Sequence, residues 1–322
     1  MKELKHNILY VAIGLLISCG GQIVPDLDGQ VEYVDVEEVM DSVVVEEVVD
    51  STENDSMATA YMPSPVKRAL VIGLGEQKDP AWGKINGDKD VPFVNDMLTK
   101  AGYNDIRTLV NQKATKANIV SAFRSLARVC NDGDVVYIHF SGHGQQVTDV
   151  SGDEEDGWDE SWIPYDAYLK YGVDDRGERH LVDDEVNTLL NAIRSKIGDA
   201  GKMLVVVDAC HSGTSTRGTD EEETIRGVNE GFVIPDVVHE KRVKEQDRWL
   251  TLSACKDYQV NQEMKTPKVG KLTYALYSVA KEGAVTEAAV REFVMKNRGR
   301  RPQTPVLTGE TSECGLYSFF ER

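Results

Sequence analysis

From about residue 67 onward, the apolar positions of this chain follow two alternating patterns. Continuous runs rich in valine and isoleucine are typical of buried strands, and apolar residues three or four positions apart are typical of amphipathic helices. The runs predict strands at residues 68–74, 106–110, 135–142, 204–210, 249–254 and 316–320, and a short extended piece at 161–165. The helical spacing predicts helices at residues 90–101, 116–130, 183–197, 272–282 and 287–297.

Strands and helices alternate along this part of the chain, which favours a mostly parallel sheet with helices packed on both of its faces. We therefore expect one α/β domain over residues 67–322. A hydrophobic content of 41% is ample for the core of such a domain.

The N-terminal residues 1–19 follow a different pattern, with Lys2 and Lys5 ahead of an apolar run over 8–17. The run is too short to span a bilayer and favours the core of a signal peptide. It ends in Leu-Ile-Ser-Cys19, which resembles a bacterial lipobox, where the peptide is cut before the cysteine and lipid is attached to its thiol. Gly20 at the next position resembles lipoproteins sent on to the outer membrane. We expect an exported, membrane-anchored lipoprotein; the alternative is an ordinary signal peptide with an incidental cysteine.

Residues 20–66 contain no lysine or arginine and interleave valine with acidic residues. This density of like charge resists packing, so the segment is expected to be a solvated, flexible tether. The alternation of valine with acid also suits a strand on a basic partner surface, including this protein's own cleft, and that alternative stays open.

The net charge of the chain is −18, and its basic residues form no dense cluster. Phosphate backbones require a concentrated basic face, so nucleic acid is excluded as a partner. Cationic substrates and metal ions are better matched. The five cysteines are an odd number without paired spacing, which indicates neither a disulfide framework nor a zinc site.

Two of the predicted buried strands end in reactive side chains. His143 follows the strand that begins at Val135, and Cys210 follows the strand that begins at Leu204. The crevice beyond the carboxyl ends of parallel strands is where α/β sheets bind ligands, so adjacent strands would bring the thiol and the imidazole together. A thiol beside an imidazole is a nucleophile for amide carbonyls. We predict a Cys/His dyad, with His211 as an alternative base.

The motifs around these residues resemble the caspase-like peptidases, and within them the metacaspases. They are Ser141-Gly-His-Gly144, Asp208-Ala-Cys-His-Ser-Gly213, the acidic loop Gly152-Asp-Glu-Glu-Asp-Gly-Trp-Asp-Glu-Ser-Trp-Ile-Pro-Tyr-Asp166, and Leu181-Val-Asp-Asp184. The resemblance implies a caspase-like three-layer sandwich and a cysteine endopeptidase. It also implies that the amides of Gly144 and Cys210 bind the oxyanion.

The resemblance further implies a preference for peptides and proteins with Arg or Lys before the scissile bond. Its acidic specificity pocket maps onto Asp208, Ser141 and Asp90. Asp88 is the rival for Asp90, because the local spacing is one residue shorter than the family pattern. The alternative is that Asp90 simply stabilises a helix N-terminus electrostatically.

Many metacaspases need calcium, and the resemblance places its ligands at Asp159, Asp183 and Asp184. Carboxylate oxygens from separate loops are what Ca²⁺ prefers. Arg217 stands where a fourth acid is expected, and Asp220 is the alternative. Without an ion, Asp183 would be a helix cap and residues 153–160 a solvated loop.

The long charged segment over residues 214–247 has no sustained periodicity, which indicates loop. Exposed loops are where proteolysis concentrates, so a peptidase specific for basic residues would be expected to cut itself there. The candidate sites are Arg217, Arg226, Lys241, Arg242 and Lys244.

Two other classes of protein remain as alternatives. One is a non-catalytic binding module on a caspase-like frame, against which the presence of both Cys210 and His143 argues. The other is a flavodoxin-like or nucleotide-binding α/β protein. That class requires a glycine-rich phosphate loop after the first strand, and Gly73-Leu-Gly75 is too sparse.

We predict that the mature protein carries lipid on Cys19, because the cysteine directly follows a signal-like apolar run. Membrane fractionation and mass spectrometry of the N-terminal peptide check this. Recovery of the mature protein in the soluble fraction, with no lipid mass on its first residue, contradicts it.

Overall fold

The chain divides into two units, Met1–Tyr61 and Met62–Arg322. The computed structural model describes residues 23–25, 31–33, 64–210, 224–228, 230–235, 248–283, 285–309 and 315–321. In the first unit, β1 (Ile23–Pro25) pairs antiparallel with β2 (Val31–Tyr33). Cys19, the predicted signal peptide and most of the predicted tether lie outside the described residues. Among the described helices, none combines the length and the apolar character needed to cross a bilayer.

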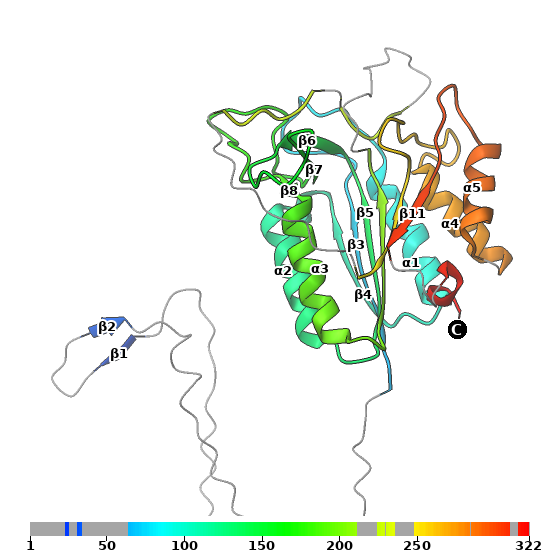
Figure 1. The fold of residues 1–322 in the computed structure, drawn as a ribbon, viewed down its shortest axis with the longest axis horizontal. Helices are drawn as coiled ribbons and strands as arrows, with labels where there is room; N and C mark the ends of the chain where they lie inside the picture. Colours follow the sequence, from blue (N-terminus) through cyan, green and yellow to red (C-terminus); the bar gives the residue numbers. More distant parts are fainter. Residues whose placement is uncertain are drawn as a thin grey trace, which may run out of the picture. The chain divides into compact units, whose positions relative to one another are not determined.

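The second unit is built on a six-stranded sheet in the order β11-β10-β9-β5-β3-β4 (Figure 1). All neighbouring strands are parallel except β11, which runs antiparallel to β10. The strands are β3 (Lys67–Gly73), β4 (Asp105–Val110), β5 (Val135–Ser141), β9 (Lys202–Asp208), β10 (Leu250–Ser253) and β11 (Val306–Gly309).

Helices cover both faces of this sheet (Figure 1). On one face lie α2 (Lys116–Val129) and α3 (Asp183–Ile197), and on the other lie α1 (Asp90–Lys100), α4 (Lys271–Glu282) and α5 (Glu287–Lys296). Side chains alternate across each strand, so β3 buries Leu70 and Ile72 on the first face and Ala69 and Val71 on the second. The predicted α/β architecture, a mostly parallel sheet between two helical layers, is confirmed.

A second, three-stranded antiparallel sheet follows directly after β5. It consists of β6 (Gly144–Thr148), β7 (Trp158–Trp162) and β8 (Leu181–Val182), in that order. The sequence analysis expected only a short extended piece at residues 161–165. Because β8 leads into α3, this small sheet brings the acidic loop beside the start of that helix.

One prediction at the C-terminus was wrong, and one strand there was not predicted. Residues 316–320 form not a strand but the 3₁₀ helix η3 (Leu316–Phe319), in which Leu316 and Phe319 are buried at a spacing of three and Tyr317 is exposed. The final strand is β11 instead, an edge strand between Pro305 and the left-handed Gly309. Half-exposed edge strands carry little apolar pattern, which is why the sequence did not reveal it.

Shorter 3₁₀ turns join the main elements. They are η1 (Gly87–Lys89), which leads into α1, and η2 (Asn111–Lys113), which follows β4. Thr115 caps α2, since its hydroxyl accepts a hydrogen bond of 3.3 Å from the amide of Asn118.

Candidate active site

The carboxyl ends of β5 and β9 bring Cys210 and His143 to one edge of the sheet. These strands are parallel neighbours, and their register pairs Ser141 with Asp208. His143 and Cys210 each lie two residues beyond that pair, and both are buried. The expected adjacency of the two strands is confirmed, and it places a thiol and an imidazole at the same rim. His211, the alternative base, lies outside the described residues.

The loop before α1 fixes the orientation of the His143 ring. Nε2 of His143 lies 2.7 Å from the carbonyl oxygen of Gly83, which only accepts, so Nε2 carries the proton of the neutral ring. Nδ1 has no hydrogen-bond partner among the described residues. The Trp82 ring packs against the imidazole with centroids 5.1 Å apart. A backbone carbonyl therefore orients the histidine, and Nδ1 is left to accept a proton.

Burial keeps this imidazole neutral. Desolvation lowers the pKa of His143 to about 4, and the nearby Arg226 lowers it further, against the opposing effects of the Gly83 carbonyl and Glu263. The cause is the cost of charging a ring that is away from water. At neutral pH the ring is thus a proton acceptor.

The backbone amide and the thiol of Cys210 have separate partners. The amide donates a hydrogen bond of 2.7 Å to the carbonyl oxygen of Arg226. The thiol lies 3.6 Å from the carbonyl oxygen of Gln259, which also accepts from the thiol of Cys255 at 3.5 Å. The contact with Cys210, together with burial, raises the pKa of Cys255 well above its usual range. Gly144, the other implied oxyanion donor, starts β6 directly after His143.

Two fully buried aspartates lie next to this edge. Asp90 is the first residue of α1 and accepts hydrogen bonds from the Ser141 hydroxyl at 2.7 Å and the Gly270 amide at 2.8 Å. Asp208 is the last residue of β9 and accepts bonds from the amide and hydroxyl of Thr273 at 2.8 and 2.6 Å. Gly270 and Thr273 belong to the N-terminal turn of α4, whose free N–H groups and dipole favour carboxylates.

Arg226 places its guanidinium between these aspartates and Glu263, and it is itself fully buried. Its Nη1 lies 2.6 Å from Asp90 Oδ2 and 3.4 Å from Asp208 Oδ1. Its Nε lies 3.1 Å from Glu263 Oε1. We call the space enclosed by the carboxylates of Asp90, Asp208 and Glu263 the acidic pocket.

Charge and burial compete inside the acidic pocket. Burial and the neighbouring Asp208 raise the pKa of Asp90 to about 6, although Arg226 acts in the opposite direction. Burial also acts on Asp208, but Arg226 and the hydrogen bonds from Thr273 and Asn261 hold its pKa below its usual range. Burial alone would lower the pKa of Arg226, yet the three carboxylates raise it above its ordinary value. The pocket therefore holds a firm charge pair between Asp208 and Arg226.

Asp90 and Asp88, the two candidates for the acidic pocket, have different surroundings in the structure. The carboxylate of Asp88 faces another way and lies 3.4 Å from the amide nitrogen of Asn111. Sequence reasoning missed Glu263 and the α4 donors, because no motif marks them and they lie far along the chain from Asp90. It also missed Gly83, since a backbone carbonyl leaves no trace in residue type.

The three predicted calcium ligands fall into separate acidic groups. Asp159 lies with Asp149 and Asp153, and Asp183 lies with Glu154 and Glu160, each set having carboxylate oxygens within 4.8 Å of one another. Asp184 belongs to neither set, but its negative charge helps to raise the pKa of Asp159. Arg217 and Asp220 lie outside the described residues.

The environment of Asp159 fits a cation with oxygen ligands. Burial raises the pKa of Asp159 to about 8, and the charges of Asp183, Asp149, Asp184 and Asp153 add to this effect. Its Oδ1 is buried without a hydrogen-bond partner in the described part of the chain. A divalent cation would stabilise the charged form of a carboxylate that is buried among other acids.

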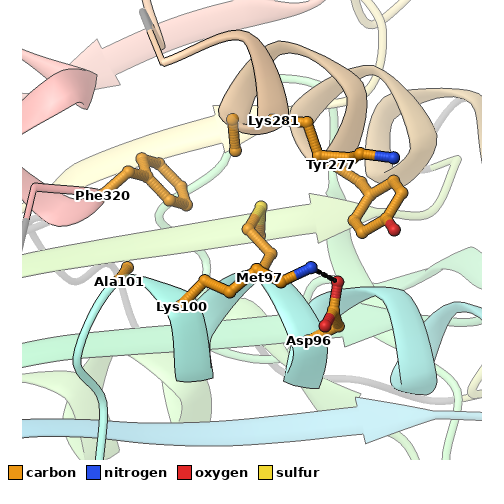
Figure 2. Close-up of a pocket in the computed structure, with 8 residues that line it drawn as sticks. Asp96, Met97, Lys100, Ala101, Tyr277, Lys281 and Phe320 are labelled. Carbon is orange, nitrogen blue, oxygen red and sulfur yellow. Dashed lines mark hydrogen bonds and ion pairs between the residues drawn. The ribbon is translucent and has the colours of Figure 1, made fainter.

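A separate cavity of about 450 Å³ lies between α1 and α4 (Figure 2). Lys100 and Asp96 face it and pair with each other at 2.6 Å. Its lining contains no cysteine and no histidine, so it lacks the nucleophile and the base that lie at the sheet edge. Its lining residues are Asp96, Met97, Lys100, Ala101, Tyr277, Ala280, Lys281 and Phe320.

Solved structures support the fold. A crystal structure of a protein from Geobacter sulfurreducens aligns with a TM-score of 0.58 and 24% identity, covering 80% of this chain and 97% of that one. At this identity the alignment shows the fold alone, and the described sheet and helical layers agree with it.

Comparison with known families agrees with the geometry. The family model of the metacaspase peptidase C14 domain matches residues 67–217. Over 164 residues the chain is 35% identical to Metacaspase-2 of Arabidopsis thaliana, a match that spans 47% of this chain and 36% of that protein. Over 161 residues it is 35% identical to Metacaspase-1B of Aspergillus fumigatus, spanning 46% and 36%. Over residues 67–217 the chain is therefore similar to the metacaspase peptidase C14 domain, carried on an α/β fold, and it spans about a third of the length of these relatives.

Proposed function

We propose that this chain is an endopeptidase that acts through Cys210 and His143 and cleaves after Arg or Lys. The observation that carries the proposal is the acidic pocket, which holds the buried guanidinium of Arg226 while the carbonyl oxygen of the same residue accepts a hydrogen bond from the Cys210 amide. The curated relatives are matched over only 36% of their length, so the substrate preference is argued from this chain's own contacts.

The chemistry follows from the positions of the two side chains. Nδ1 of His143 is the free acceptor on a neutral ring, so it takes the proton of the Cys210 thiol as the sulfur attacks a peptide carbonyl. The Cys210 amide donates to the oxygen that becomes negative. The imidazolium then protonates the leaving amine, and water hydrolyses the thioester.

The preference for a basic residue has an electrostatic origin. A guanidinium or ammonium loses its hydration in the acidic pocket, and only paired carboxylates offset that cost. The planar fork of arginine contacts Asp90 and Glu263 through different nitrogens, as Arg226 does. An aspartate side chain there would meet three carboxylates and be repelled.

We also propose that Ca²⁺ binds at the acids around Asp159. Asp149, Asp153 and Asp159 would hold it, while Asp183 and Asp184 at the start of α3 would add negative charge near Asp159 without belonging to that group of ligands. The ion would supply positive charge that stabilises the loop between β6 and β7. Membrane attachment through Cys19 and an outer-membrane location are further proposals that rest on the sequence.

The first prediction tests the dyad and the pocket together. With the full chain preincubated with Ca²⁺, Cys210→Ala and His143→Ala should each lower hydrolysis of matched peptides by more than about a thousandfold.

Peptides with Arg or Lys before the bond should be cut, and those with Asp or Ala should not. Asp208→Asn should lower kcat/KM for Arg peptides by on the order of 100-fold, because one partner of a buried pair is lost.

The exposed Asp257→Asn is the matched control for Asp208→Asn, and thermal unfolding verifies that each variant is folded. Activity of Cys210→Ala within tenfold of wild type would end the dyad assignment. Cleavage after Asp as fast as after Arg would end the assignment of the acidic pocket.

A second prediction concerns protonation of His143. Since burial lowers its pKa to about 4, its ring signals should stay constant through the range near pH 6.5 where an exposed histidine titrates. Histidine-resolved NMR of the Cys210→Ala variant measures this, with His143→Gln to assign the signal. A midpoint at or above 6.5 would show a charged ring in weakly acidic solution and no buried base.

A third prediction tests calcium binding without using activity. Ca²⁺ should raise the Tm of the Cys210→Ala variant, because an ion bound only to the folded state stabilises it. Adding Asp159→Asn should abolish this shift, whereas the exposed Asp174→Asn should retain it. Equal shifts in both double variants would place the ion elsewhere.

A further inference from the structure

Strand β5 carries three polar side chains on the face that α4 covers. Side chains alternate across a strand, so Tyr137, His139 and Ser141 share one face of the sheet. None of the three is more than 1% exposed. His139 is therefore a polar group in the protein interior, where both of its ring nitrogens require partners. The proposed mechanism gives this imidazole no part.

Both ring nitrogens of His139 have such partners. Nδ1 lies 3.1 Å from the hydroxyl of Tyr137. Nε2 lies 3.0 Å from the hydroxyl of Ser141 and 3.2 Å from the hydroxyl of Thr273, which belongs to the first turn of α4. The imidazole thus connects β5 with the start of α4, next to the two aspartates of the acidic pocket.

The hydroxyls of Ser141 and Thr273 direct their protons towards these aspartates. The Ser141 hydroxyl donates to Asp90 Oδ2 at 2.7 Å. The Thr273 hydroxyl donates to Asp208 Oδ2 at 2.6 Å. An ionised carboxylate only accepts hydrogen bonds, and a hydroxyl has a single proton to give. Neither hydroxyl has a second proton for His139, so both accept from its Nε2.

This arrangement fixes the tautomer of His139. Nε2 carries the proton and shares it between the two hydroxyl oxygens, while Nδ1 accepts from the phenol of Tyr137. Burial raises the pKa of Tyr137 well above its usual range, so the phenol keeps its proton. Burial also lowers the pKa of His139 to about 4, so the ring is neutral. In the opposite tautomer, one hydroxyl would turn its proton to Nε2 and an aspartate would lose a donor.

The guanidinium in the acidic pocket belongs to Arg226, where the sequence analysis expected an exposed loop. That expectation is wrong, because the side chain is fully buried. The other four basic residues named as cleavage candidates lie outside the described residues, namely Arg217, Lys241, Arg242 and Lys244. Arg226 therefore shows which carboxylate oxygens a cation contacts in this pocket.

One of those oxygens also receives the Ser141 hydroxyl. Arg226 Nη1 lies 2.6 Å from Asp90 Oδ2, the atom to which Ser141 donates. If the hydroxyl pointed elsewhere, two oxygens 2.7 Å apart would face each other without a proton between them, which disfavours the charged carboxylate. The direction of the hydroxyl protons thus sets how much negative charge the pocket offers to a cation.

We infer that His139 is a positioning residue for substrate recognition, whose Nε2 proton holds the Ser141 and Thr273 hydroxyls in the orientation that supplies both pocket aspartates with donors. This inference rests on the proposed endopeptidase function and adds a specificity-determining residue to the same site. His139 contacts neither the guanidinium nor the reacting atoms among the described residues. Its effect is therefore on binding of the basic side chain rather than on the chemistry at Cys210.

The kinetic experiment compares two replacements of His139 in the full chain with Ca²⁺. Glutamine offers an amide N–H in place of Nε2, whereas methionine has a similar length and no donor. His139→Met should raise KM for Arg peptides by about tenfold and leave kcat within about threefold, because the ground and transition states lose the same charge pairing. His139→Gln should recover most of this loss.

Two controls separate positioning from damage to the fold. Alkylation of Cys210 by iodoacetamide, followed by mass spectrometry of its peptide, should proceed in both variants at the wild-type rate, because this small neutral reagent does not use the acidic pocket. Thermal unfolding verifies that each variant is folded. His139→Gln keeps a hydrogen-bond donor, so it stays informative if the methionine variant does not fold.

A double-mutant cycle tests whether His139 acts through the hydroxyls. In a Ser141→Ala background, His139→Met should raise KM by a smaller factor than in wild type, because one of the two hydroxyls that it orients is already absent. A histidine that only fills space would give the same factor in both backgrounds.

The tautomer is measured without activity, by NMR of Cys210→Ala protein with nitrogen-labelled histidine. The His139 signals, assigned with His139→Gln, should show a proton on Nε2 and none on Nδ1 at neutral pH. A proton on Nδ1 overturns the inference, because the two hydroxyls would then have no donor.

The outcomes distinguish this inference from the function on which it rests. If wild type hydrolyses Arg peptides but the glutamine and methionine variants have equal KM values, or the cycle is additive, the inference is overturned and the peptidase remains. Wild-type protein that cuts no Arg peptide overturns the proposed function, and the role of His139 in recognition with it.

Discussion

The buried charge balance around Asp90 and Asp208 is the constraint on which the active-site edge depends. Two carboxylates without water cost several kcal/mol each unless donors and a cation surround them. The first turn of α4 supplies N–H groups from Gly270 and Thr273, and Arg226 supplies the cation. This requirement sets how closely α4 must approach the ends of β5 and β9. Gly270 permits it, because a Cβ there would lie 2.1 Å from an Asp208 carboxylate oxygen.

In the proposed mechanism, the exclusion of water that would make the acidic pocket selective also keeps the His143 ring neutral. His143 is buried beneath Trp82, and its Nε2 proton is committed to the Gly83 carbonyl. Desolvation keeps the ring neutral, so Nδ1 is available without a carboxylate partner to orient it. Under that proposal, substrate binding, proton transfer and oxyanion stabilisation would share one water-poor edge, where electrostatic interactions are stronger than in solvent.

An occupied acidic pocket also has a consequence for folding. With Arg226 in place, three buried acids share a single compensating cation, and burial together with the neighbouring Asp208 raises the pKa of Asp90 to about 6. The hydrogen bonds from α4 come from Gly270 and Thr273 and do not involve Arg226. The two aspartates are therefore positioned by contacts with α4 that are separate from their ion pairs with Arg226.

The sequence by itself determined the elements and the chemistry that lies at their ends. Strand and helix patterns are local, so apolar runs identified β3, β5, β9 and β10, and the residues just beyond them revealed Cys210 and His143. Asp208 and Asp90 followed from motifs. The edge strand β11, the small sheet of β6 to β8, and the pairing of Glu263 with Arg226 did not. Only tertiary structure decided that Arg226 is buried, because its partner Asp90 lies 136 residues away in the chain. No local pattern records which distant loop fills a pocket, since that outcome depends on the combined desolvation and charge of segments that meet only in the folded protein.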